Sequence, residues 1–178
     1  MRRRLASLAA VLVSACATLP PPSPTDVAAF ELSGRVAVRY GAEAASGRAE
    51  WRHSAASDDL VISNPIGQGI ASIQRREGEY VLQTSDGKRY TARDPEALTQ
   101  DVLGWRLPLE GLPEWVRGRA MSGTPAETRL DGARLGELRQ LGWTIEYLEY
   151  GENGLPRRMR LTREDLDIRL VVEEWRQP

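Results

Sequence analysis

The sequence predicts a mainly β protein, of α+β type, with a small helical block, and three observations support this class. Residues 30–40 alternate apolar and polar side chains, and residues 166–172 repeat the pattern, which is typical of strands with one buried and one solvated face. Further short strand candidates lie between them, separated by turns such as Asp86-Gly87. Because no long helix intervenes, we expect an antiparallel meander.

The intermediate strands are marked by β-branched and aromatic residues. They are predicted at residues 47–52, 60–63, 70–75, 80–84, 88–92, 143–147 and 157–161. Glu77-Gly78 and Asn153-Gly154 have the composition of tight turns between neighbouring strands.

Helices are predicted where boundary residues frame an apolar stripe. Asp94 is a suitable N-cap for a first helix that Gly104 ends. Its stripe consists of Leu98, Val102 and Leu103. A second helix begins at Leu112 and is closed by Gly118, and a third candidate covers residues 135–141. The first two form one block within the strand series, so we expect a plug or lid against a curved sheet.

Composition excludes several classes. The 178 residues suffice for one domain, and Lys and Arg total 24 against 25 Asp and Glu, a net charge of −1 that disfavours nucleic-acid binding. One cysteine and one histidine cannot form a Cys/His zinc site or an internal disulfide framework. We expect no metal and no cofactor.

Catalytic motifs are also missing from the sequence. Lys88 follows Gly87, but Arg89 comes next and Leu82 stands where a phosphate-binding loop needs its first glycine. His53 and Ser54 are neighbours whose side chains would point to opposite faces of a strand. The adjacent acids Asp58 and Asp59 fit a solvated turn better than acid–base chemistry. We therefore expect no catalytic residues.

The N-terminus has the pattern of a secretory signal peptide, residues 1–15, with three arginines followed by a short apolar run. The tetrapeptide ending in Cys16 resembles the bacterial lipobox, which implies a diacylglycerol and an N-acyl chain on that cysteine. An ordinary signal peptide with a chance cysteine is the alternative. Residues 16–27 hold four prolines and are predicted to be an extended tether; residues 28–178 form the domain. Ala17, in place of Asp, implies the outer membrane by the lipoprotein sorting rule.

Large aromatic side chains are frequent for a small domain, with five tryptophans and five tyrosines. Most of them would simply fill a core. A barrel of about eight or more strands can instead enclose a cavity, and aromatic walls suit an acyl chain.

Several motifs resemble, in order, the LolB family of outer-membrane lipoprotein receptors. They are Ser33-Gly34-Arg35-Val36-Ala37-Val38, Ser63-Asn64-Pro65-Ile66-Gly67, Gly87-Lys88-Arg89-Tyr90-Thr91-Ala92, Leu107-Pro108-Leu109 with Trp115, Gly142-Trp143, and Leu161-Thr162 through Trp175. The resemblance implies an unclosed antiparallel β-barrel with a hydrophobic cavity and a short α-helical lid.

The resemblance also implies a function. A lipid-anchored monomer on the outer membrane of a Gram-negative bacterium, facing the periplasm, would take acylated lipoproteins from the periplasmic carrier LolA and insert them among the phospholipids of the inner leaflet. The alternatives are a lipoprotein of related fold that binds another lipid or glycolipid, and a structural envelope lipoprotein with a filled core.

Two sets of site residues follow. Pro65, Ile66 and Gly67 form a turn whose aliphatic tip, by resemblance, engages the membrane; the alternative is that Ile66 folds back over the core. The acyl cavity and lid are predicted to involve Trp51, Leu98, Val102, Leu109, Leu112, Trp115, Trp143 and Ile145.

Overall fold

The computed structural model describes residues 29–176, which contain eleven strands and two helices. In chain order these are β1 (Phe30–Tyr40), β2 (Glu43–His53), β3 (Ser57–Ser63), β4 (Gly69–Arg76), β5 (Glu79–Thr84), β6 (Arg89–Ala92), α1 (Pro95–Leu103), α2 (Leu112–Trp115), β7 (Glu127–Asp131), β8 (Arg134–Gln140), β9 (Trp143–Tyr150), β10 (Pro156–Arg163) and β11 (Leu166–Arg176). Cys16 and the predicted signal peptide and tether lie outside the described residues.

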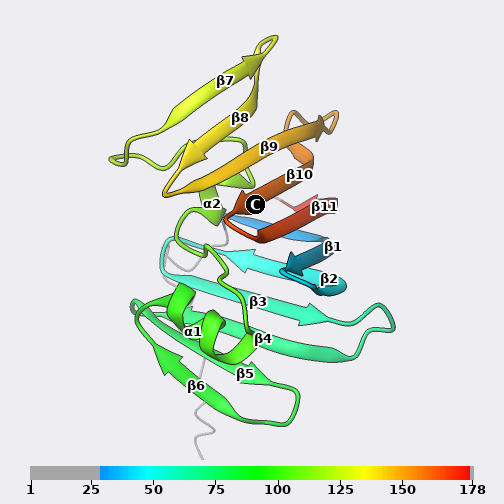
Figure 1. Cartoon of the computed structure of the whole chain (residues 1–178), viewed down its shortest axis with the longest axis vertical. Coiled ribbons are helices and arrows are strands. Elements are labelled where there is room, and N and C mark those ends of the chain that lie inside the picture. Colours follow the sequence, from blue (N-terminus) through cyan, green and yellow to red (C-terminus); the bar gives the residue numbers. More distant parts are fainter. Residues whose placement is uncertain (1–28, 177–178) are drawn as a thin grey trace, which may run out of the picture.

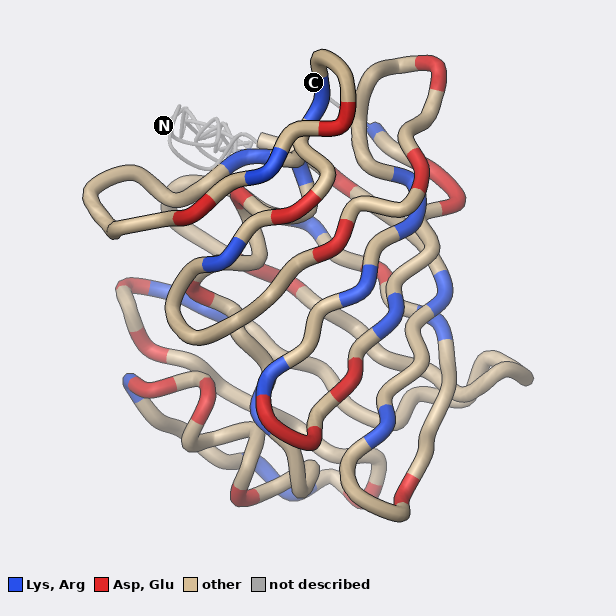
Figure 2. Tube along the Cα trace, turned by 45° about the horizontal axis from the view of Figure 1, so that its top comes forward, with Lys and Arg blue, Asp and Glu red and all other residues tan. Residues whose placement is uncertain are grey.

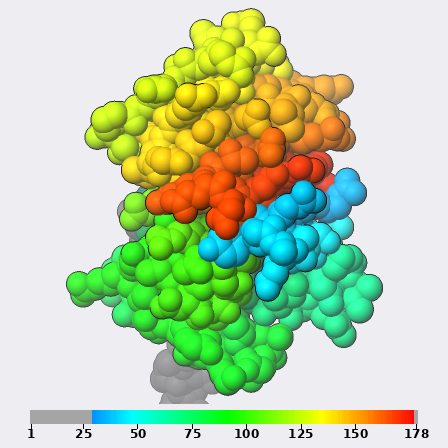
Figure 3. Space-filling view, viewed as in Figure 1, coloured from blue at the N-terminus to red at the C-terminus, as the bar shows by residue number. Residues whose placement is uncertain are grey.

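All eleven strands form one antiparallel sheet in the order β6-β5-β4-β3-β2-β1-β11-β10-β9-β8-β7. The first and last strands pair with each other at its centre, where red β11 lies beside blue β1 (Figure 3). The edge strands β6 and β7 lie at opposite ends of the molecule and do not pair (Figure 1). The predicted antiparallel meander and unclosed barrel are confirmed.

One face of the sheet forms the core, as the alternation predicts. In β1 the even-numbered residues Phe30, Leu32 and Val38 are buried, and β11 buries Ile168 and Leu170. The helices cover this inner face, with α1 against β5 and β6 (Figure 1). Within residues 29–176 the buried side chains of the sheet and both helices form one hydrophobic cluster, which gives this segment a core.

Two glycines allow the sheet to curve tightly. A Cβ atom on Gly34 would lie 2.3 Å from the carbonyl oxygen of Val171, and one on Gly47 would lie 2.1 Å from that of Ser63. Both distances exclude any side chain, so glycine is needed where neighbouring strands approach this closely.

The predicted helix at residues 135–141 is wrong, because this segment is strand β8. Leu135, Leu138 and Leu141 have helical spacing, but Leu141 belongs to the turn before β9 and has a φ of 53°. The signal that was missed is Asp131-Gly132, a tight turn with Gly132 at φ 61° that pairs β7 with β8. Pairing with β7 and β9 outweighs the local apolar spacing.

Candidate functional site

An apolar cavity of about 60 Å³ lies between the inner face of the sheet and the connection from α1 to α2. All of its lining side chains are apolar: Leu32, Val36, Ala49, Trp51, Leu60, Ile62, Trp105, Leu107, Leu109, Leu112, Leu161, Ile168 and Leu170. Four of them come from the α1–α2 segment, residues 104–112, which forms the roof. Such a surface offers dispersion contacts and no hydrogen bonds, so it suits a hydrocarbon.

The predicted cavity residues divide into two groups. Trp51, Leu109 and Leu112 line the cavity. The others pack in the surrounding hydrophobic cluster without lining it: Leu98, Val102, Trp115, Trp143 and Ile145. Sequence reasoning favoured large aromatic residues and so missed the aliphatic majority of the lining, although the alternation in residues 30–40 and 166–172 already marks Leu32, Val36, Ile168 and Leu170 as inward-facing.

The roof segment is attached at a few defined points. The fully buried hydroxyl of Thr99 in α1 accepts a hydrogen bond from the Leu107 backbone N–H at 2.9 Å and donates to the Pro95 carbonyl. Glu96 of α1 pairs with Arg163 of β10 at 2.9 Å. The strands are joined by continuous ladders of backbone hydrogen bonds, so the roof segment has fewer polar attachments than the rest of the cavity wall.

A buried amide fixes the chain that follows α2. Gln140 of β8 accepts hydrogen bonds from Trp115 Nε1 and the Met121 N–H, both at 2.9 Å, and donates to the carbonyls of Met121 and Thr124. The carbonyl of Trp115 accepts a further bond from the Tyr147 hydroxyl at 3.0 Å. Burial raises the pKa of this tyrosine well above its ordinary value.

The turn at residues 64–68 presents its aliphatic tip to solvent. The Asn64 side chain accepts hydrogen bonds from the backbone N–H groups of Ile66 at 3.1 Å and Gln68 at 2.9 Å, and Gly67 has a φ of 86°. These bonds hold the turn rigid with the Ile66 side chain pointing outward, 80% exposed. The structure therefore shows a protruding residue, and not one that folds back over the core.

Asp58 belongs to a buried polar cluster, so its assignment to a solvated turn is wrong. Its carboxylate accepts hydrogen bonds from Trp51 Nε1 at 2.9 Å and from Arg75 Nε, and it lies 2.7 Å from His53 Nδ1. His53 also stacks on Phe30. The cluster bonds internally and joins β2, β3 and β4, which gives it a structural role.

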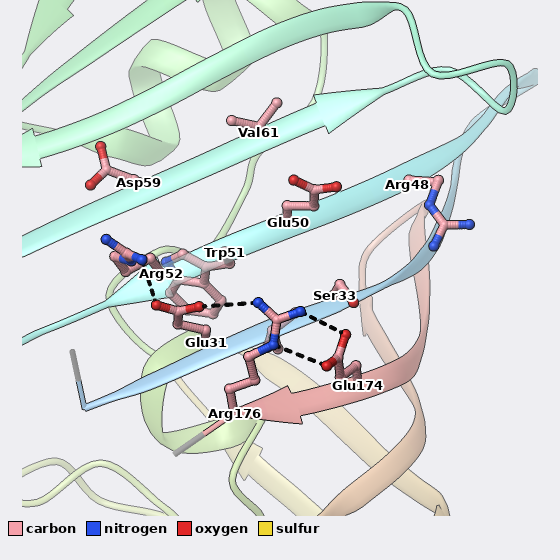
Figure 4. Close-up of a pocket in the computed structure, with 11 residues that line it drawn as sticks. Glu31, Ser33, Arg48, Glu50, Trp51, Arg52, Asp59, Val61, Glu174 and Arg176 are labelled. Carbon is pink, nitrogen blue, oxygen red and sulfur yellow. Dashed lines mark hydrogen bonds and ion pairs between the residues drawn. The ribbon is translucent and has the colours of Figure 1, made fainter. Parts of the chain in front are cut away.

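A polar hollow of about 500 Å³ lies on the outer face near the start of β1 (Figure 4). There Arg176 lies between Glu31 and Glu174, and Glu31 also pairs with Arg52 at 2.6 Å. These ion pairs tie β11 to β1 and β2. Within residues 29–176 no group of three or more acidic, His or Cys side chains could hold a metal ion.

Neither helix in the described part of the chain is long and apolar enough to cross a bilayer. Among solved structures, a DUF1329 family protein from Desulfovibrio piger is similar over 86% of this chain and 87% of that one, with a TM-score of 0.52 and 9% sequence identity. This likeness concerns the fold alone.

Sequence comparisons are more specific. Residues 28–175 match the profile of a family described as "Outer membrane lipoprotein LolB". The proteins named "Outer-membrane lipoprotein LolB" from Pseudomonas syringae pv. syringae and Thiobacillus denitrificans are 40% and 36% identical to this chain. The first alignment covers 82% of this chain and 73% of the relative, and the second covers 97% of both. The resemblance seen in the motifs is confirmed, and the chain belongs to the LolB family.

Proposed function

We propose that this protein is an outer-membrane receptor that accepts acylated lipoproteins from the periplasmic carrier LolA and inserts them into the inner leaflet of the outer membrane. The observation that carries the proposal is the wholly apolar cavity beneath the α1–α2 segment. Family membership supports it, because the relatives are named outer-membrane lipoproteins.

The energetics of cargo transfer explain the need for such a cavity. Each methylene moved out of water contributes about 0.8 kcal/mol, so exposing one acyl chain of about fifteen methylenes costs roughly 10 kcal/mol or more. An apolar wall replaces the lost hydrocarbon contacts at every step between carrier and bilayer. Such a wall does not read the protein part of the cargo, so one receptor can serve many lipoproteins. The function involves no chemical reaction, and we propose no enzymatic activity.

The cavity must widen to take an acyl chain. An engineered apolar cavity of about 150 Å³ holds a single benzene ring, whereas this one measures about 60 Å³. The roof segment, residues 104–112, contributes four lining side chains and is attached through the bonds of Thr99 and the Glu96–Arg163 pair. We propose that acyl chains enter as this segment moves away from the sheet.

Delivery is assigned to the turn that carries Ile66. Fully burying an isoleucine side chain contributes about 1.5–3 kcal/mol, so bilayer insertion of this exposed tip stabilises contact with the membrane by roughly 10- to 150-fold. Lipid chains attached to Cys16 would keep the domain at the membrane surface between deliveries. This cysteine lies outside the described residues.

Transfer in vitro tests the proposal. LolA loaded with a lipoprotein is mixed with the anchor-free chain, residues 17–178, and the cargo is followed by pull-down. We expect the cargo to move to this protein. Cargo that stays on a carrier able to deliver to another LolB protein would overturn the proposal and favour the binding of a different lipid.

Acyl-chain photocrosslinking then tests the location of the site. We expect labels at Leu60, Leu109 and Leu170, which lie on the wall and roof of the cavity. Labelling confined to the turn at Ile66 would show that the acyl chains do not enter the cavity.

A further inference from the structure

A second, larger hollow of about 760 Å³ lies on the outer face of the sheet. Its walls come from β1, β2, β9, β10 and β11, and Pro65 contributes to its rim. This places it directly beside the exposed tip at Ile66 and on the side of the sheet opposite the acyl cavity.

The charged residues of this hollow are mostly basic. Its lining includes five arginines and one acid: Arg35, Arg48, Arg158, Arg160, Arg169 and Glu146. We call it the arginine groove. Basic positions recur on adjacent strands of the sheet (Figure 2), although the whole chain has a net charge of −1. The positive charge is therefore concentrated locally.

The ion pairs around the arginine groove leave guanidinium donors free. Glu173 is shared by Arg35 at 2.9 Å and Arg48 at 2.7 Å. Asp167 is likewise shared by Arg160 at 3.0 Å and Arg169 at 3.3 Å. Each guanidinium has five N–H donors, so a single carboxylate cannot accept hydrogen bonds from all the donors of two guanidinium groups.

Glu146 and Glu149 supply the remaining carboxylates, at 3.5 Å from Arg160 and 3.7 Å from Arg158. Four carboxylates thus face five arginines, and positive charge and unused donors remain. Planar guanidinium groups match phosphate oxygens in bidentate geometry.

The floor of the groove is apolar. Ala37 and Val171 lie between the arginines, and Leu148 is 58% exposed beside them. A site for a free inorganic anion has no need of an apolar floor, whereas the glycerol and first methylenes of a lipid would cover it. The ligand best matched to this combination is amphiphilic, with a phosphate above an apolar part.

We propose that the arginine groove binds the phosphate headgroups of anionic phospholipids in the bilayer that the Ile66 turn enters. Headgroup contacts at the groove and insertion of the adjacent tip would then orient the domain during delivery. This inference rests on the proposed role of the turn. Headgroup binding by the groove and insertion of the turn can be separated by experiment. Salt screens charge pairing at an exposed surface, whereas apolar insertion is insensitive to it.

The test is binding of the anchor-free chain to vesicles of phosphatidylcholine alone or with about one-third phosphatidylglycerol. The test variant is Arg35→Gln/Arg169→Gln, which leaves Glu173 paired with Arg48 and Asp167 paired with Arg160. The matched control is Arg119→Gln/Arg129→Gln, whose partners Glu114 and Glu137 keep Arg117 and Arg139. Both variants remove two exposed arginines, so they change the net charge equally.

We expect the unmodified chain to prefer the anionic vesicles at about 0.05 M salt. The groove variant should bind them about 30-fold more weakly, as two surface arginines together contribute that factor, and the control variant should keep the preference. At about 0.5 M salt the preference should vanish for all three proteins. Ile66→Ser, which removes the apolar tip without adding a charge, should weaken binding to both vesicle types and leave the ratio between them unchanged.

Three results would overturn the inference. One is equal binding of the unmodified chain to both vesicle types, and another is an equal loss in the groove and control variants. The third is saturation of the groove by inorganic phosphate without any preference for anionic vesicles, which would make it a site for a soluble anion. None of these results depends on whether cargo moves from LolA, so failure of the inference and failure of the proposed function can be told apart.

Discussion

Replacing Gln140 by Leu tests how strongly the chain after α2 is fixed to the sheet. The side chain is 3% exposed, and leucine has a similar size but no polar atoms. The substitution leaves the buried Trp115 Nε1 and the partly buried Met121 N–H without an acceptor, and it removes both donors to the carbonyls of Met121 and Thr124.

A buried donor left unsatisfied costs about 1–3 kcal/mol and each further hydrogen bond lost about 0.5–1.5 kcal/mol, so losing these four bonds should lower the free energy of unfolding by about 4 kcal/mol. For a chain of this size the Tm should fall by about 8–16 °C. Thermal unfolding followed by circular dichroism measures the change. The control is Gln74→Leu, which removes an exposed hydrogen bond to Asp59 and should shift the Tm by less than about 2 °C. Equal shifts in the two variants would refute the reasoning that burial of the amide network decides the effect.

Three further predictions concern the tip, the cavity and the effect of pH. Ile66→Glu should lower the insertion of cargo into liposomes by about 10-fold or more, while Leu130→Glu, at a side chain 64% exposed on β7, should leave it unchanged; equal insertion by both would contradict the role of the tip. Ala49→Leu fills the cavity, so it should reduce cargo uptake with little loss of stability. Ala71 is buried outside the cavity lining, so Ala71→Leu should lower the free energy of unfolding by about 1–3 kcal/mol and leave cargo uptake unchanged. Transfer assays and urea unfolding check both variants. Burial raises the pKa of Tyr147, so the stabilisation from its neutral phenol is complete below the ordinary tyrosine pKa of 10.0 and is lost as the pH rises above it. Tyr147→Phe should therefore reduce the fall in the free energy of unfolding above about pH 10, measured by urea unfolding. An unchanged slope would contradict this.

Strand positions were the most predictable part of the fold. A period of two leaves few alternatives when apolar residues recur as regularly as in residues 30–40, and glycine turns such as Asp86-Gly87 fix where each strand ends. The segment 135–141 shows the limit of this reasoning. Its leucines fit a helix locally, and only pairing with β7 and β9 makes it a strand.

The site was predictable to a smaller extent. An aliphatic residue between Asn-Pro and Gly is anomalous in any turn, so Ile66 could be singled out without a structure. The cavity lining could not be predicted in this way, because every inward-facing residue of every strand is a candidate lining residue. Empty space remains only where side chains from β1, β2, β3, β10, β11 and the roof segment fail to fill the volume between them.

The sequence by itself determined most of the strand series, the helical block, the aliphatic residue of the 64–68 turn and the family, since each depends on neighbouring residues or on motifs in order. The tertiary structure decided which side chains meet. It alone brings β1 beside β11 and gathers arginines from β1, β2, β10 and β11 into one groove. Arg35 and Arg169 are 134 residues apart in the chain. They line the same surface because strand register, which is set by the packing of the whole sheet, places them diagonally on the same face of the adjacent strands β1 and β11, with Arg35 opposite Val171 and Arg169 opposite Ala37.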